Sequence, residues 1–349
     1  MGKRNRFVLR LKRFVLKILC TVLGVVLAVL VAGTAYFQSR IDRIQRVEPG
    51  ENPALSQQEL ADFLASETEP ELTDVPVMDP SLVNFGTAET TIGGKNSQVI
   101  NILLVGQDRR PGESRARSDS VILCTVNKRT NTLVLTSILR DLYVQIPGYG
   151  NNRINAAYAA GGMPLLNETL EYNFGIRVDG NVEVDFTQFQ TIVDLMGGVS
   201  IELRQDEADL LNRTLDAGVE AGVQKLSGAQ VLQYSRIRSL DGDGDFSRTN
   251  RQQKVLRAIL ESCKNASMKT ILTLVDEIFP MITTDMTNFQ ILTYALELFP
   301  VLQELELVGQ RIPADGTYSP RMIGGMAVLV ADMDAARTLL EQTLLGESQ

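Results

Sequence analysis

The stretch VINILLVGQDRRPGESRARSDSVILCTVNKRTNTLVLTSILRDL, residues 99–142, decides the fold class of this chain. It holds three apolar runs that are rich in β-branched residues: Val99–Val105, Ser120–Val126 and Thr132–Ser137. Runs of this length and composition predict buried strands, and the polar residues 127–131 predict a turn between the second and the third. This stretch therefore predicts a β-sheet that contains three consecutive strands.

Strand-like and helical segments alternate outward from this stretch. Apolar periodicity predicts further strands at 182–184, 199–203 and 305–312. It predicts helices at 57–66, 154–160, 164–173, 186–196, 226–234 and 248–263, two more between 266 and 302, and a last one within 325–345. Such alternation favours an α/β fold in which helices cover both faces of a sheet.

The N-terminal region predicts a membrane anchor. Residues 18–37 read ILCTVLGVVLAVLVAGTAYF and carry no charge, and a helix of this length spans roughly 30 Å, the thickness of a bilayer core. Residues 1–17 are basic and hold no acidic side chain, so we expect a cytoplasmic tail before a transmembrane helix. A cleaved signal peptide is the alternative, and both place the rest of the chain outside the cytosol.

Composition changes again after the apolar run. Residues 38–97 hold many acidic residues and several prolines, so we expect an extracytoplasmic stalk or loosely packed lead-in. An extracytoplasmic domain should follow at 98–349, with its motif-bearing core at 99–263.

Composition also excludes several classes of function. The formal net charge of −8 argues against a nucleic-acid partner, because phosphate neutralisation needs a basic face. The absence of His excludes Ser/His/Asp and Cys/His catalysis and His-ligated zinc. Cys20, Cys124 and Cys263 form no disulfide framework. Any catalysis must therefore use carboxylates, Arg, Lys, Tyr or a hard metal ion.

Two carboxylates flank neighbouring strand-like runs. Asp108 follows the first run and Asp119 precedes the second. If these strands are neighbours, both side chains meet at one sheet edge, where they suit a hard divalent cation that bridges to a substrate phosphate. Two loop carboxylates in water are the alternative.

Arginines gather at the boundaries of apolar elements. The set comprises Arg117, Arg140, Arg153, Arg236, Arg238 and Arg248. Guanidinium groups in an acidic protein suit a phosphate-bearing ligand, although any single arginine can simply be solvated. Gln252 lies four residues after Arg248 on the same helix face, and Asp245 either caps that helix or points into the same cleft. Asp241, Asp243 and Asp245 do not make a calcium loop, because its sixth position is Phe246 and its twelfth is Gln252.

At these residues the chain resembles the LytR-CpsA-Psr family of envelope glycopolymer ligases. The resemblance runs from about Val99 to Cys263 through, in order, NILLVGQD, SRARSDSVIL, RDLYV, RINAAYAAGG, VDLMGGVSIEL, LSGAQVLQYSRIRS and DGDFSRTNRQQ. One departure is Ser247, which stands where the family commonly has Gly.

The resemblance implies a fold, a ligand and a reaction. The fold would be similar to an α/β/α sandwich with a central mixed sheet and a long apolar pocket for a lipid tail. The reaction would move a teichoic acid or capsular polysaccharide from a polyprenyl pyrophosphate carrier to peptidoglycan as a phosphodiester. Asp108 and Asp119 would hold Mg²⁺ or Mn²⁺, and Asp245 and Gln252 would complete a site whose phosphates are gripped by Arg117, Arg140, Arg236, Arg238 and Arg248. An envelope sensor that binds the same carrier and a hydrolase that cleaves it remain alternatives.

Overall fold

The computed structural model describes residues 36, 38–47, 54–65, 75–94, 98–107, 118–238, 240, 245–264, 266, 268–298, 301 and 304–346. The chain forms two compact units, residues 1–44 and 45–349, and the sheet described below belongs to the second. Of the run 18–37 that we predict to span a membrane, only Tyr36 is among the described residues. None of the helices in the described ranges combines the length and the apolar character that a membrane crossing needs.

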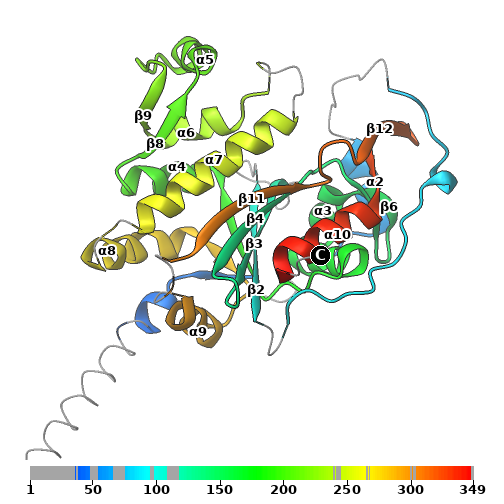
Figure 1. Cartoon of the computed structure of the whole chain (residues 1–349), viewed down its shortest axis with the longest axis horizontal. Helices are drawn as coiled ribbons and strands as arrows, with labels where there is room; N and C mark the ends of the chain where they lie inside the picture. The colour runs from blue at the N-terminus through cyan, green and yellow to red at the C-terminus, as the bar shows by residue number, and fades with distance from the viewer. Residues whose placement is uncertain are drawn as a thin grey trace, which may run out of the picture. The chain divides into compact units, whose positions relative to one another are not determined.

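A mixed sheet of seven strands forms the centre of the second unit (Figure 1). Its spatial order is β1 (Gln45–Arg46), β10 (Thr283–Thr284), β7 (Gly180–Asp185), β2 (Val99–Gln107), β3 (Ser118–Asn127), β4 (Thr132–Ile138) and β11 (Glu306–Ile312). Strands β2, β3 and β4 pair antiparallel, whereas β7 and β11 run parallel to β2 and β4. The three strands predicted from residues 99–142 are confirmed, and so is their neighbourhood.

Helices cover both faces of this sheet (Figure 1). One layer comprises α3 (Ile154–Phe174) and α10 (Met333–Leu345); the other comprises α4 (Phe186–Leu195), α6 (Gly228–Ser235) and α7 (Asp245–Lys264). Successive strand residues face opposite layers. Leu103 therefore packs in the cluster of α3, while its neighbour Leu104 packs toward α7. The predicted mixed α/β fold is confirmed.

Helix α3 contains the break that the sequence predicts between residues 160 and 164. Gly161 and Gly162 leave helical geometry, and Gly162 has a φ of +64°, which a residue with a Cβ rarely adopts. Pro164 follows, where its missing N–H costs little because a new helical turn begins there. The two predicted helices thus form one element with a kink.

Several smaller elements complete the unit. They are α2 (Gln57–Ala65), η1 (Pro80–Leu82), β5 (Tyr143–Ile146), β6 (Gly150–Arg153), β8 (Val199–Leu203), α5 (Gln205–Leu215), β9 (Gly222–Leu226), α8 (Met268–Ile278), η2 (Phe279–Met281), α9 (Asn288–Leu298), β12 (Tyr318–Ile323) and β13 (Met326–Ala331). The predicted helix at 226–234 begins only at Gly228, because Leu226 pairs in β9 and Ser227 starts a capping box with Gln230.

The segment before β2 contacts the layer of α3. Leu60 of α2 and Ile92 are buried in the same apolar cluster as α3, and Ile92 bridges to Ile176. Phe85 is buried against Tyr143 of β5. Parts of residues 38–97 therefore pack against the domain, while the boundaries assigned to the stalk stay a prediction.

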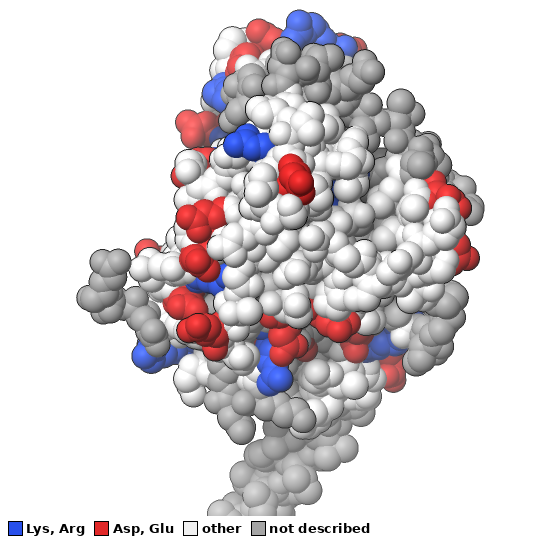
Figure 2. All heavy atoms as spheres, turned by 90° about the vertical axis from the view of Figure 1, so that its right-hand side faces the viewer, with Lys and Arg blue, Asp and Glu red and all other residues white. Residues whose placement is uncertain are grey.

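The outer surface on the side of α3 and α10 is mostly uncharged, and its charged side chains gather toward its margins (Figure 2). Acidic side chains are prominent among them, and lysine and arginine do not gather in one patch on this face. A strongly anionic ligand needs a cluster of basic side chains, and the described residues present none on this face.

Candidate functional site

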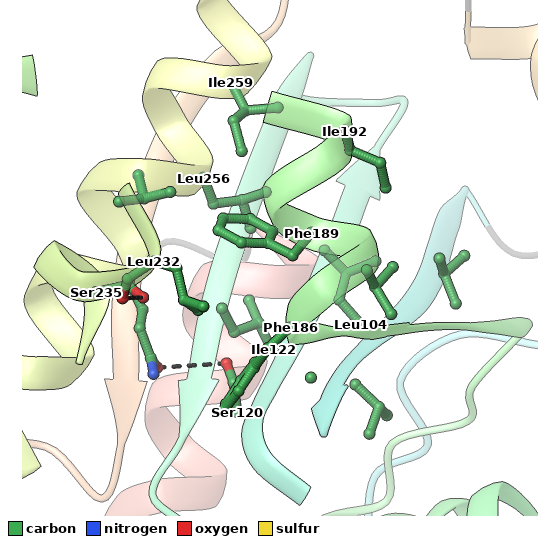
Figure 3. Close-up of a pocket in the computed structure, with 16 residues that line it drawn as sticks. Leu104, Ser120, Ile122, Phe186, Phe189, Ile192, Leu232, Ser235, Leu256 and Ile259 are labelled. Atoms are coloured by element: carbon green, nitrogen blue, oxygen red, sulfur yellow. Dashed lines mark hydrogen bonds between the residues drawn. The ribbon is translucent and has the colours of Figure 1, made fainter. Parts of the chain in front are cut away.

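An apolar cavity of about 280 Å³ lies between the sheet and the helices α4, α6 and α7 (Figure 3). Strands β2, β3 and β7 supply Leu104, Ile122 and Val182, and the helices supply most of the rest, including Phe186, Phe189, Ile192, Leu232, Leu256 and Ile259. The cavity exists because α4 and α7 stand apart over the sheet, with aromatic and branched side chains around the space between them. Its apolar wall suits a hydrocarbon chain.

Polar side chains mark one end of this cavity. Ser120 Oγ donates to Oε1 of Gln252 at 3.3 Å, and Ser235 lines the same region (Figure 3). Ser120 lies at the start of β3 and Gln252 lies on the first half of α7. The cavity thus runs from an apolar interior to the edge of the sheet at which the sequence places its charged motifs.

Helix α7 brings Arg248 to the same end. Arg248 is only 5% exposed and lies one helical turn before Gln252, as the predicted spacing requires. Gln253 Nε2 donates to Ser137 Oγ at 2.9 Å, which joins α7 to the end of β4. The helix is therefore fixed over the sheet edge from which Arg140 follows.

The two arginines after α6 differ in their surroundings. Arg236 is exposed, and its guanidinium lies 4.7 Å from the ring centre of Phe186, a residue of the cavity wall. Arg238 is also exposed. The residue between them, Ile237, accepts a hydrogen bond at its carbonyl from Arg251 at 3.2 Å.

Arg251 is a residue that the sequence analysis missed. It is buried and forms an ion pair with the buried Glu207 of α5, with 2.8 Å between Nε and Oε1. Through Glu207 and the Ile237 carbonyl it ties α7 to α5 and to the loop 236–238. Only its place between Arg248 and Gln252 signalled a role, and its partner lies 44 residues away in the chain.

Arg140 and Arg153 meet at a shared carboxylate. Asp141 Oδ2 lies 3.4 Å from Arg140 Nε, and its Oδ1 lies 3.5 Å from a terminal nitrogen of Arg153. Arg153 is 4% exposed at the end of β6, and the backbone N–H of Asn155 donates to the Arg140 carbonyl at 3.3 Å. The folded chain therefore brings these two predicted arginines together through an aspartate that the prediction left out.

A buried carboxylate lies beneath the end of β2. Glu183 of β7 accepts hydrogen bonds from the hydroxyl of Tyr158 and from the side-chain amide of Gln107. Gln107 is the last residue of β2 and precedes Asp108 in the chain. This three-residue network fixes the end of β2, and no sequence pattern marked Glu183.

Four of the predicted site residues lie wholly or partly outside the description. Asp108 and Arg117 are outside the described residues, and Asp119 and Asp245 are described only in their backbone. Gly106 pairs with Ser120 and Gln107 with Ser118, so Asp119 sits at an irregular point of the β2–β3 ladder. The predicted pair of cation ligands stays a prediction; among the described residues alone, no group of three carboxylate or thiol side chains could hold a metal ion.

The first turn of α7 is held by stacking. Phe246 stacks on Tyr318 of β12 with 4.8 Å between ring centres, and the Arg311 guanidinium lies 5.1 Å from the Phe246 ring centre. Arg311 also donates to Asn250 at 3.0 Å. Phe246, the residue that does not fit the calcium-loop pattern, thus anchors the helix that carries Arg248.

Comparison with known proteins identifies the family. The model of the LytR_cpsA_psr family matches residues 66–343. Regulatory protein MsrR of Staphylococcus aureus is 35% identical over 173 residues, which cover 49% of this chain and 51% of MsrR, so the match spans about half the length of that relative. The polyisoprenyl-teichoic acid–peptidoglycan teichoic acid transferase TagU of Bacillus cereus is 32% identical over 239 residues, covering 66% of this chain and 73% of TagU.

A solved structure agrees with the sequence relatives. TagT of Bacillus subtilis with bound octaprenyl pyrophosphate lipid superposes with a TM-score of 0.55 at 27% identity, covering 71% of this chain and 91% of TagT. The family match over most of the chain, the TagU relative and the shared fold show that this chain belongs to the LytR_cpsA_psr family.

Proposed function

We propose that this protein transfers a glycopolymer of the teichoic acid or capsular polysaccharide type from a polyprenyl pyrophosphate carrier to peptidoglycan. The observation that carries the proposal is an apolar cavity whose polar end lies beside buried and exposed arginines. A prenyl pyrophosphate has the same two parts, an apolar hydrocarbon chain and a charged pyrophosphate head. The name of TagU and the octaprenyl pyrophosphate bound to TagT support the same ligand and acceptor.

The reaction needs positioning and charge neutralisation more than a nucleophilic side chain. A hydroxyl oxygen of a peptidoglycan sugar attacks the phosphorus that carries the glycopolymer. The bond from that phosphorus to the bridging oxygen breaks, and polyprenyl phosphate leaves with the electron pair. The hydroxyl proton passes to a base, for which Asp245 is our candidate.

The arginines would stabilise the charge that develops during this transfer. In this proposal the phosphates are bound by six arginines: Arg117, Arg140, Arg153, Arg236, Arg238 and Arg248. Gln252 orients the head group at the mouth of the cavity. Guanidinium groups keep their charge at any physiological pH and offer two parallel donors to phosphate oxygens. Such fixed donors lower the barrier because they do not reorganise during the reaction.

Asp108 and Asp119 would hold Mg²⁺ or Mn²⁺ in this proposal. Their carboxylates are the oxygen donors that such hard cations prefer, and the β2–β3 ladder ends next to both residues in the chain. The bound cation would supply positive charge to the pyrophosphate oxygens.

The proposed acceptor also requires a location. Peptidoglycan lies outside the cytoplasmic membrane, so residues 1–17 would be cytoplasmic, residues 18–37 would span the membrane, and the domain would be extracytoplasmic. The charge asymmetry around the apolar run supports this orientation.

An in vitro transfer assay tests the proposal. The full chain, a prenyl pyrophosphate-linked oligosaccharide and a peptidoglycan oligomer should yield a phosphodiester product detectable by mass spectrometry. Arg140→Ala and Arg248→Ala should each lower the rate by about a hundredfold or more, because each removes a fixed donor to the phosphates. Arg177→Ala is the matched control, because the Arg177 side chain is exposed and pairs with Glu171 of α3, in the layer on the other face of the sheet.

The same assay separates the alternatives. Free oligosaccharide without a joined product would indicate hydrolysis, and binding of the carrier without any product would indicate a sensor, which the name of MsrR as a regulatory protein favours. Asp108→Ala should raise the Mg²⁺ concentration needed for half-maximal transfer. An unchanged titration would remove Asp108 from the metal site, and normal transfer by both arginine variants would remove the ligase proposal.

A further inference from the structure

Helix α9 carries large apolar side chains on a surface that no described segment covers. Phe289 is 77% exposed and Leu296 is 67% exposed, although most large apolar side chains of the domain are buried. The two residues are seven apart, so they share one side of the helix, with the partly buried Leu292 between them. We call these three residues the α9 face. Apolar residues grouped on one side of an exposed helix indicate an interaction surface.

The start of α9 is fixed to the strand nearest the N-terminus. Strand β1 pairs with β10, which ends four residues before α9 begins. Arg46 of β1 donates both to the Met286 carbonyl and to the side chain of Asn288, the first residue of α9. Gln45 also donates to the Pro280 carbonyl of η2 at 2.9 Å. Helix α9 therefore cannot move independently of β1.

Strand β1 lies close in the chain to the apolar run that we propose as the membrane span. The run ends at Phe37 and β1 begins at Gln45, eight residues later. Even a fully extended chain of this length reaches no more than roughly 28 Å. Because β1 holds α9, the α9 face must stay near the point at which such a span would leave the bilayer.

The β3–β4 turn lies beside α9, because Lys128 of this turn pairs with Glu297 of α9 at 3.0 Å. The three residues of the α9 face are themselves uncharged. Because β1 ties α9 to the chain that follows the proposed span, a bilayer surface is the partner that suits an apolar face at this place.

We propose that the α9 face lies on the outer surface of the membrane, with Phe289 and Leu296 in the boundary between head groups and acyl chains. This inference rests on the proposed membrane span of residues 18–37. It gives the domain a fixed orientation on the bilayer. Helix α8 precedes η2 and contacts α4, which lines the cavity, so the side of the cavity formed by α4 lies on the same part of the domain as α9. A prenyl chain could then pass between bilayer and cavity without crossing open water.

The chain contains no tryptophan, which gives a clean test. Phe289→Trp places a single fluorophore on the α9 face, and Val223→Trp places one at a site of β9 that is 70% exposed and lies at the far end of the domain (Figure 1). The full chain carrying each substitution is reconstituted into vesicles of phosphatidylcholine and phosphatidylglycerol, with and without brominated acyl chains. We expect brominated lipid to quench the emission of Phe289→Trp about twofold and to leave Val223→Trp unchanged.

Two measurements keep the outcomes apart. Flotation of the vesicles reports the anchor, and quenching reports the α9 face. Flotation without quenching of Phe289→Trp, or equal quenching of both variants, overturns the membrane contact of α9 and leaves the anchor standing. Loss of flotation overturns the membrane span and the inference with it. Adding Leu296→Glu to Phe289→Trp should reverse most of the quenching while flotation is kept; unchanged quenching would count against Leu296 as part of the contact.

Discussion

The two helical layers on the central sheet pack in different ways, although the same strands serve both. Toward α3 and α10, Leu103, Leu123 and Leu166 have no exposed surface. Toward α4 and α7, Leu104 and Leu256 stay partly exposed and line a cavity of about 280 Å³. We call the densely packed layer of α3 and α10 the sealed layer, and the layer of α4, α6 and α7, which contains the cavity, the open layer.

The sealed layer owes its density to small residues. Helix α3 begins with Ala156, Ala157, Ala159 and Ala160, all fully or almost fully buried, so its backbone can approach the sheet closely. The open layer places Phe186 and Phe189 around a space that none of the described side chains fills. The dense packing therefore lies on one face of the sheet and the proposed binding cavity on the other, so substitutions at adjacent residues of one strand should separate stability from lipid binding.

The largest effect is expected from a pair of adjacent leucines in β2. Leu103→Ala removes a side chain from the sealed layer and should lower the free energy of unfolding by about 2–5 kcal/mol, because a cavity forms in a dense core. Leu104→Ala enlarges a cavity that already exists and should cost about 1 kcal/mol. Urea unfolding followed by circular dichroism measures both.

The pair is its own control, since both changes remove the same atoms from neighbouring positions. Equal losses of stability would mean that the two layers are packed alike, and the contrast drawn between them would then fall.

A smaller effect is expected from enlarging a side chain on each face. Ala157→Phe forces a ring into the sealed layer and should lower stability by about 1–3 kcal/mol. Val184→Phe points the same ring into the cavity wall and should cost less than about 1 kcal/mol. It should weaken the binding of prenyl pyrophosphate about tenfold, because the ring takes space that the chain would occupy. Thermal unfolding and a titration with prenyl pyrophosphate test the two claims.

Unchanged lipid binding by a folded Val184→Phe protein would show that the prenyl chain lies elsewhere. A loss of stability as large as that of Ala157→Phe would show that the open layer has no spare volume.

Local patterns predicted the central part of the fold and the helical spacing of two candidate site residues. The runs that form β2, β3 and β4 are each continuous in the chain, and so is the Gly161–Gly162 break of α3. The four-residue spacing of Arg248 and Gln252 likewise needs only a helix to have meaning. Patterns of this kind can be interpreted without knowing the fold, because they depend only on residues that are close together in the chain.

What could not be predicted depends on partners that are far apart in the chain. Glu207 looks like a solvated residue of a polar helix until Arg251 buries it. Glu183 looks like an exposed strand residue until Tyr158 and Gln107 donate to it. The strands β8 and β9 pair across α5, and only the first of them was predicted. The cavity depends on how α4 and α7 are spaced, which no single segment encodes, so only the resemblance to the family led us to expect an apolar pocket.

The two cysteines of the open layer, Cys124 on β3 and Cys263 on α7, offer a chemical test of whether water reaches its interior. Burial raises the pKa of the Cys124 thiol to about 12, and burial also raises the pKa of Cys263 on α7. Only the thiolate reacts with iodoacetamide, so the raised pKa leaves very little reactive Cys124 at pH 8. In a Cys20→Ala background, alkylation of Cys124 should be at least about a hundredfold slower than in urea, and both cysteines should react faster as the pH rises. Peptide mass spectrometry follows each site separately. Alkylation of Cys124 in the folded protein at the rate seen in urea would mean that water reaches the sheet beneath α7, and the open layer would then be a solvent channel instead of an apolar cavity.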